Sequence, residues 1–201
     1  DVLGADGLEQ YRQLADDAWS TVDHADRYGA VFRIRQARIG VAIGARNPDE
    51  LIAVKRHDLH SPNDYLEIVR LLADVGRTED AIDWARRGLD TFADRWHQTP
   101  KLRDALARLL EARGDATEVE QLYWDAYARR PTLTGYLQYV DHASDPDTAG
   151  ERAIVHLKAK VGRPFPDGRG TYPADELIRI LDHDGRDEDT WDTMLAHGCH
   201  H

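Results

Sequence analysis

Apolar residues recur along this chain with a helical spacing, and four of the apolar stretches end at a glycine. These glycines are Gly44, Gly76, Gly114 and Gly185. The residues four, five, seven and eight positions before them are mostly apolar, and these offsets lie on one face of a helix with about 3.6 residues per turn. Each stretch therefore predicts a helix that buries one stripe and ends at a glycine in the left-handed conformation.

A helix-start signal follows each glycine. Asn47 precedes Pro48, Thr78 precedes two acids, Thr117 and Glu120 have the spacing of a capping box, and three acids begin at Asp187. The glycines are 32, 38 and 71 residues apart, and the last interval is close to two units. The missing turn is expected near residues 144–146, which read Ser-Asp-Pro. The pattern predicts repeated helix-turn-helix units.

The caps and the periodicity together predict about eleven helices and no sheet. The expected ranges are a leading helix at 7–26, followed by the pairs 30–44 with 48–58, 62–76 with 79–94, 100–113 with 118–130, 133–144 with 147–161, and 174–184 with 188–197. This is an all-α fold, an α-solenoid of about five helical hairpins plus a leading helix. We expect residues 1–201 to form one helical-repeat domain, with the glycine- and proline-rich loop at 162–172 as a connection or a sub-block boundary.

The residues also resemble two known groups of proteins. Residues 64–92 resemble a tetratricopeptide repeat through Tyr65, Val69 and Leu72 on the first helix, with Ala81 and Ala85 on the second. The order of segments looks like the helical region of bacterial SWIM zinc-finger proteins, and the matching pieces are LEQYRQLADDAW, LIAVKRHDLHSPNDYLEIVRLLADVGR, KLRDALARLLEARGD and ARRPTLTGYLQY. The resemblance covers most of residues 8–140. That family's zinc site needs three cysteines and a histidine, and this chain has one cysteine, so the resemblance implies the helical part without the finger.

Charge and composition limit the classes of partner that this chain is expected to bind. The formal net charge is −11, with 26 basic against 37 acidic residues and no long basic run, which argues against nucleic-acid binding through this chain alone. No apolar run reaches the roughly 20 residues that a membrane span needs. The single cysteine, Cys199, excludes an internal disulfide and suits the cytoplasm. The chain opens at Asp1 without a methionine, which fits a fragment of a larger protein.

The residues at one fixed distance before the four glycines form a column, and one polar column accompanies the apolar columns described above. The sixth residue before each glycine is an arginine, on the side of the helix opposite the apolar stripe; the four are Arg38, Arg70, Arg108 and Arg179. If these side chains share the open face of a helical stack, they form a ladder for acidic groups of a protein or peptide partner. Alternatively, arginine simply favours a solvent-facing helix centre, and acids on the same helices, such as Asp74 and Asp104, pair with it.

Candidate chemistry is sparse, and we expect no cofactor and no resident metal. The C-terminal residues His197, Cys199, His200 and His201 offer zinc ligands, but four such close neighbours do not easily point at one ion. The acidic string at 182–189 lacks the glycine and glutamate positions of a calcium-binding EF-hand loop. His57-Asp58, and likewise the pair at 141–142, are adjacent in sequence and so point about 100° apart on a helix.

The tryptophans Trp84, Trp96, Trp124 and Trp191 recur towards the middle or end of second helices, and packing between helices is favoured for them over a peptide groove. Two function classes follow. The first is a non-catalytic protein-interaction scaffold. The second is a small-ligand-binding or hydrolase-like helical domain that uses His57, Asp58 or the 162–172 loop.

Overall fold

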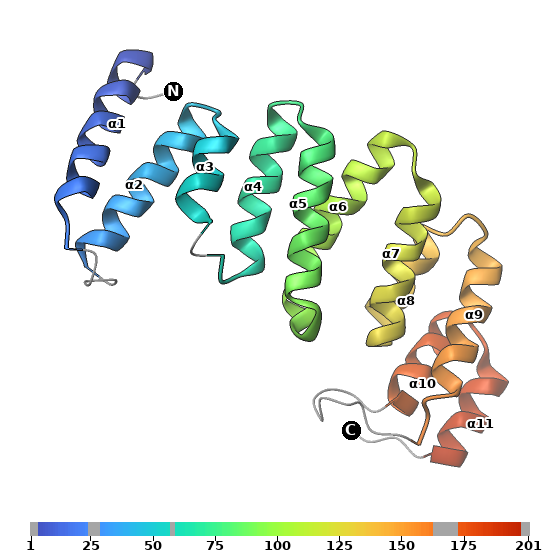
Figure 1. The fold of residues 1–201 in the computed structure, drawn as a ribbon. Helices are drawn as coiled ribbons and strands as arrows, with labels where there is room; N and C mark the ends of the chain where they lie inside the picture. The colour runs from blue at the N-terminus through green and yellow to red at the C-terminus, as the bar shows by residue number, and fades with distance from the viewer. Residues whose placement is uncertain (1–3, 24–28, 57–58, 163–172, 198–201) are drawn as a thin grey trace. The chain divides into compact units, whose positions relative to one another are not determined.

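The computed structural model describes residues 4–23, 29–56, 59–162 and 173–197, and within these ranges the chain is all-helical without strands. Figure 1 shows the helices in chain order. The first part comprises α1 (Gly4–Thr21), α2 (Ala30–Gly44), α3 (Pro48–Lys55), α4 (Pro62–Asp74), α5 (Thr78–Thr91), a 3-10 helix (Ala93–Gln98) and α6 (Pro100–Arg113). The remainder comprises α7 (Ala116–Arg129), α8 (Leu133–Asp141), α9 (Pro146–Lys158), α10 (Pro173–His183) and α11 (Asp187–His197).

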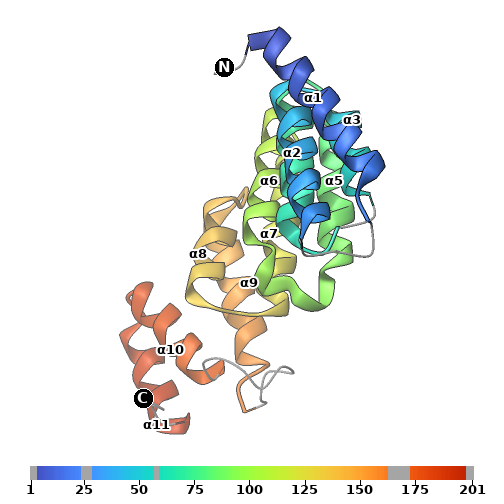
Figure 2. The same cartoon turned by 90° about the vertical axis from the view of Figure 1, so that its left-hand side faces the viewer.

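The contacts divide the chain into two compact units, residues 1–109 (unit 1) and 110–201 (unit 2), with the division inside α6. Neighbouring helices pack as pairs within each unit. The expected pairs α2 with α3, α4 with α5, α8 with α9, and α10 with α11 are confirmed. Figure 2 shows α8 beside α9 and α10 beside α11 in unit 2. The loop expected at 162–172 lies almost entirely outside the described residues.

The start signal at Asn47-Pro48 is confirmed, and α4 and α9 also begin at a proline that follows a capping side chain. Asn47 accepts a hydrogen bond from the backbone N–H of Glu50 at 3.2 Å, and Pro48 is the first residue of α3. Ser61 and Asp64 cap each other reciprocally at the start of α4. Asp145 caps α9, where the turn without a glycine was expected. In each case a side-chain oxygen satisfies an N–H group that the first helical turn leaves unpaired.

Two predicted caps are wrong. Helix α5 begins at Thr78 itself, with Arg77 as the residue before it and no side-chain cap. Helix α7 begins after Asp115, and no side chain caps it either. Glu120 does not reach back to the start of α7: its Oε2 accepts hydrogen bonds from the backbone N–H and the hydroxyl of Ser144 instead. A tertiary contact in unit 2 has taken the side chain that the local pattern assigned to a capping box.

Three of the four glycine ends are confirmed, with φ of +80° at Gly76, +92° at Gly114 and +67° at Gly185. Gly44 is the exception. It is the last residue of α2, and Arg46 adopts the left-handed conformation after it, with φ of 52°. A Cβ on Gly44 would lie 3.2 Å from a methyl group of Leu8, so glycine here permits the close approach of α1.

The apolar columns form the core wherever the helix is strongly amphipathic. In α4, Ile68, Val69, Leu71 and Leu72 are all buried, and the corresponding residues of α10 are buried as well. Helix α2 departs from the pattern, because the column places Gln36 and Gly40 on the stripe and both are exposed. The buried residues of α2 are Val31, Ile39, Val41 and Ala42.

An arginine that follows a left-handed glycine forms the same pair of contacts in both units. In unit 1, Arg77 donates from Nε to Asp80 at 2.7 Å and from Nη1 to Asp49 at 2.8 Å. In unit 2, Arg186 donates from Nε to Asp189 at 2.9 Å and from Nη1 to Glu151 at 2.6 Å. The nearer acid is three residues on in the next helix, and the farther one belongs to an earlier helix. The Gly-Arg-x-Glu-Asp string therefore ties three helices together at each turn.

A part-buried ionic cluster joins α3 to α4. Lys55 Nζ lies 2.9 Å from Asp64 Oδ1 and 2.8 Å from Glu67 Oε2, and the lysine side chain is buried. Partial burial disfavours the charged form of Asp64. Hydrogen bonds from Lys55 and Ser61, together with the charge of Lys55, outweigh that effect and hold the pKa of Asp64 below its ordinary value.

This lowered pKa predicts an acid-labile contribution to stability. Because the folded-state pKa of Asp64 lies below its unfolded value, the contribution is complete above about pH 4 and is lost as the pH falls through the folded pKa. We expect Asp64→Asn to lower the free energy of unfolding by about 1–3 kcal/mol at pH 7. The deficit should shrink at pH 2–3 in urea titrations followed by circular dichroism. An equal deficit at both pH values would contradict the role of the ionised carboxylate.

No helix within the described ranges is long and apolar enough to cross a membrane.

Candidate ligand-binding groove

A groove of about 380 Å³ lies in unit 1 between α4 and the first half of α6. Helix α4 contributes Val69, Arg70, Ala73 and Asp74 to its lining, and α6 contributes Lys101, Asp104, Ala105, Arg108 and Leu109. The apolar members are buried or half-buried, whereas both arginines and Lys101 are exposed. The groove therefore has an apolar floor and a charged rim, a combination typical of sites that take a ligand of mixed character.

The three cations on the rim have no anionic partner among the described residues. None of Arg70, Lys101 and Arg108 forms an ion pair or a side-chain hydrogen bond with another residue in the described part of the chain. Arg70 and Asp74 are four residues apart on α4, but the arginine comes first, and that order gives the weaker pairing on a helix. Three unpaired cations converge on one groove of a protein whose formal net charge is −11. The same lining includes the acids Asp74 and Asp104, so the three cations are the groups of this mixed groove with which an anion would pair.

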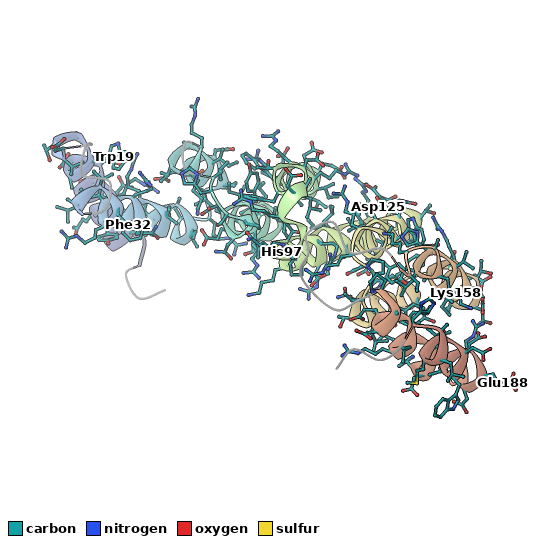
Figure 3. The ribbon with its side chains drawn as sticks, turned by 90° about the horizontal axis from the view of Figure 1, so that it is seen from below. Trp19, Phe32, His97, Asp125, Lys158 and Glu188 are labelled. Atoms are coloured by element: carbon teal, nitrogen blue, oxygen red, sulfur yellow. The ribbon has the colours of Figure 1, made fainter. Side chains whose placement is uncertain are left out.

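The other two arginines of the column are engaged. Arg38 Nε lies 2.9 Å from Asp16 Oδ1, and its guanidinium carbon is 5.2 Å from the centre of the Trp19 ring of α1, which Figure 3 labels. In unit 2, Arg179 Nη1 lies 3.6 Å from Glu176 Oε1. The four arginines therefore do not behave alike. Only Arg70 and Arg108 line the groove, and the binding role of the column stays a prediction.

Sequence reasoning missed two polar members of this site. Lys101 lies outside the arginine column, and Asp104 was considered only as an ion-pair partner. A signal for both was present, because residues 101, 104 and 108 follow a spacing of three and four and so share one face of α6. A column at one fixed distance from the glycines contains one residue per helix, so it does not include the neighbours of that residue on the same face.

Asp104 is the least satisfied polar group of the groove. The side chain is half-buried, and its Oδ1 is shielded from solvent without a hydrogen-bond donor among the described residues. An ionised carboxylate in such surroundings carries a desolvation cost that a donor would relieve. The neighbouring cations on α6 do not supply that donor in this structure.

A second depression, of about 450 Å³, lies in unit 2 and differs in its charge balance. Asp184 accepts a hydrogen bond from the Tyr136 hydroxyl and lies 3.0 Å from His183 Nδ1. Burial and the nearby Asp184 charge raise the pKa of Tyr136 above its ordinary value. Arg186 is paired with Glu151 and Asp189. Most charges here satisfy one another, and no serine, threonine or cysteine lines this depression in the part of unit 2 that is described.

Those of the remaining candidate residues that the structure describes form no metal site. Within the described residues, no three histidine, cysteine or acidic side chains are arranged to hold a metal ion. His57, Asp58, Cys199, His200 and His201 lie outside those residues, and His197 ends α11. The acidic string at 182–189 spans the turn between α10 and α11, and His142 stacks on Tyr123 with ring centres 4.2 Å apart.

The tryptophans divide between packing and exposure. Trp124 packs against Tyr139 with ring centres 5.2 Å apart, and the Arg152 guanidinium carbon lies 3.6 Å from its centre. Trp84 packs against Tyr65 at 5.9 Å. Interhelical packing is therefore confirmed for these two. It is wrong for Trp191, a residue of α11 that is 65% exposed, and the Trp96 side chain lies outside the described part.

Comparison with known proteins returned no matching family model, curated protein or solved structure. The class of protein defined here is an all-α protein of paired helices with a groove of mixed charge.

Proposed function

We propose that this chain is a non-catalytic protein-interaction scaffold, one part of a larger cytoplasmic protein of the SWIM type, and that the groove between α4 and α6 takes a peptide segment with acidic side chains. Within each unit, the helix pairs would stack in the tetratricopeptide manner. The observation that carries the proposal is the convergence of three unpaired cations, Arg70, Lys101 and Arg108, on one groove.

The floor of the groove supports a peptide over a bare anion. Val69 is buried, and Ala73, Ala105 and Leu109 are half-buried, so the floor offers apolar surface for aliphatic side chains. The exposed cations above it would bind carboxylates through charge-assisted hydrogen bonds. A volume of about 380 Å³ accommodates a few side chains of a longer segment. The affinity of such a segment would depend on several moderate contacts.

The resemblance of most of residues 8–140 to the helical region of SWIM proteins is the ground for placing this chain in a SWIM-type protein, and it transfers no activity to the chain. The second class, a hydrolase or small-ligand domain, gains no specific support from the described residues. Tyr136 and Asp184 line the unit 2 depression, and His183 contacts Asp184, but no serine, threonine or cysteine lines it among the described residues.

The test is a binding titration with a fluorescein-labelled oligoglutamate peptide, followed by fluorescence anisotropy. We expect Arg70→Glu combined with Arg108→Glu to weaken binding by about 100-fold or more, because two charge-assisted contacts of about 1.5 kcal/mol each are replaced by repulsion. Binding to the unaltered protein should weaken with added salt, since the groove is open to solvent.

A matched double variant separates the groove from overall charge. Arg33 and Arg86 are exposed or partly exposed arginines of unit 1 away from the groove, so Arg33→Glu with Arg86→Glu changes the net charge equally. This control should retain most of the affinity, and thermal melting should show that both double variants remain folded. Equal losses in the two double variants would contradict a groove-specific role.

A further inference from the structure

The groove contains an acceptor as well as its cations. Asp104 lies three residues after Lys101 and four before Arg108 on α6, and all three line the groove. Its Oδ1 has no donor among the described residues, although two cations are neighbours on the same helix. An ionised carboxylate only accepts hydrogen bonds. A ligand that leaves Asp104 without a donor therefore leaves its desolvation cost in place.

We infer that Asp104 accepts a hydrogen bond from an N–H group of the ligand, so that the groove selects an acidic peptide segment and rejects polyanions that carry only acceptors, such as polyphosphate. This inference rests on the proposed function of the groove. A peptide meets both requirements, since its carboxylates suit Arg70 and Arg108 and its backbone N–H suits Asp104.

The geometry of an aspartate makes this contact accessible. Oδ1 is shielded from solvent, whereas Oδ2 is not among the shielded atoms without a partner, so a ligand N–H would bond to Oδ2 and offset part of the desolvation cost of the shared carboxylate charge. A phosphate chain entering the same groove meets the Asp104 charge directly and has no donor to offset the repulsion. The groove discriminates between anions because its cations attract every anion, whereas Asp104 repels anions that have no hydrogen-bond donor.

Two probes test the inference, because Asp104→Ala should lower the affinity for one probe and raise the affinity for the other. We expect the affinity for the oligoglutamate peptide to fall about tenfold, the loss of one hydrogen bond to a charged group. The affinity for inorganic polyphosphate, measured by competition, should rise several-fold because a repulsive charge is removed. Asp90→Ala removes an exposed acid of α5 outside the groove and should change neither affinity by more than about twofold.

Each other outcome contradicts a definite statement. If Asp104→Ala binds both probes more tightly, Asp104 merely competes for the cations; the inference is then overturned while the proposed function stands. If the unaltered protein binds polyphosphate as tightly as the peptide, the selectivity is absent. If it binds neither probe, the proposed function fails, and this inference fails with it. Circular dichroism on each variant checks that α6 and its neighbours remain folded.

Discussion

Tyr127→Ala should lower the free energy of unfolding of unit 2 by about 3–5 kcal/mol, the range found when a buried aromatic side chain is truncated to alanine. The Tyr127 side chain is fully buried in α7. Its ring lies within 6.4 Å, centre to centre, of Tyr136 and Tyr139 in α8 and within 6.2 Å of His156 in α9. Truncation removes contacts from α7 to two other helices at once and leaves a cavity among the three.

The hydroxyl group adds a separate contribution. Tyr127 Oη donates to the backbone carbonyl of Ala153 at 3.0 Å. Tyr127→Phe should therefore cost only about 1 kcal/mol, because it removes one hydrogen bond and keeps the ring. Burial, followed by the effects of Tyr136 and Glu176, raises the pKa of Tyr127 above its ordinary value of 10.0.

This raised pKa makes unit 2 sensitive to alkali. Above about pH 10 the unfolded chain releases the tyrosine proton while the folded chain retains it, so stability falls as the pH rises. Tyr127→Phe should reduce this loss. Urea unfolding at pH 7 and pH 11, with hydrogen exchange to locate the change in residues 110–201, measures both effects. A deficit for Tyr127→Ala below about 1 kcal/mol would show that α7, α8 and α9 do not depend on this ring.

Gly88→Ala should destabilise unit 1 by about 1–3 kcal/mol, although alanine is the better helix former. Gly88 lies inside α5. A Cβ added there would be 2.7 Å from Leu102 Cδ2 and 2.9 Å from both Cβ and Cγ of Tyr65. The leucine methyl could move aside, but the stem of Tyr65 is fixed by its own helix and is buried. Glycine thus permits α4 and α6 to approach α5 closely.

Gly40→Ala is the matched control, and we expect it to stabilise the protein instead of destabilising it. Gly40 also lies inside a helix, α2, but it is exposed and a Cβ there would meet no atom within 4 Å. Helix propensity alone should then stabilise the protein by about 0.5–1 kcal/mol. Thermal melting of both variants compares the two effects directly. If Gly88→Ala raised the melting temperature as much as Gly40→Ala, the close packing of α4, α5 and α6 would be wrong.

The helices themselves were largely predictable, because caps and apolar periodicity are local signals. Pro48, Pro62 and Pro100 each begin a helix as expected, α9 begins at Pro146, one residue before the expected start, and Gly76, Gly114 and Gly185 take the left-handed conformation. Prediction failed where a distant residue competes for a side chain or a backbone. Ser144 donates a hydrogen bond to the Glu120 carboxylate, and Gly44 leaves room for the Leu8 side chain. Neither Glu120 nor Gly44 therefore has the role that its neighbours in sequence suggest.

The candidate site was predictable only in part. The arginine column includes Arg70 and Arg108, but it also includes Arg38 and Arg179, which the structure engages with Asp16 and Glu176. Periodicity shows which side of a helix a residue occupies. Whether an acid from another element reaches that side, as Asp16 of α1 reaches Arg38, depends on contacts between segments that are far apart in the sequence.

By itself, the sequence determined the helical class, most helix ends and the apolar faces, since each follows from interactions within about four residues along the chain. Only the tertiary structure decided that Gly88 is a packing position, that Tyr127 joins three helices, and that Arg70 and Arg108 converge with Lys101 and Asp104 on one groove. The physical reason is that burial and charge pairing are properties of neighbours in space. In a helical repeat, those neighbours are set by how the faces of different helices pack together, and the sequence of one helix does not specify that packing.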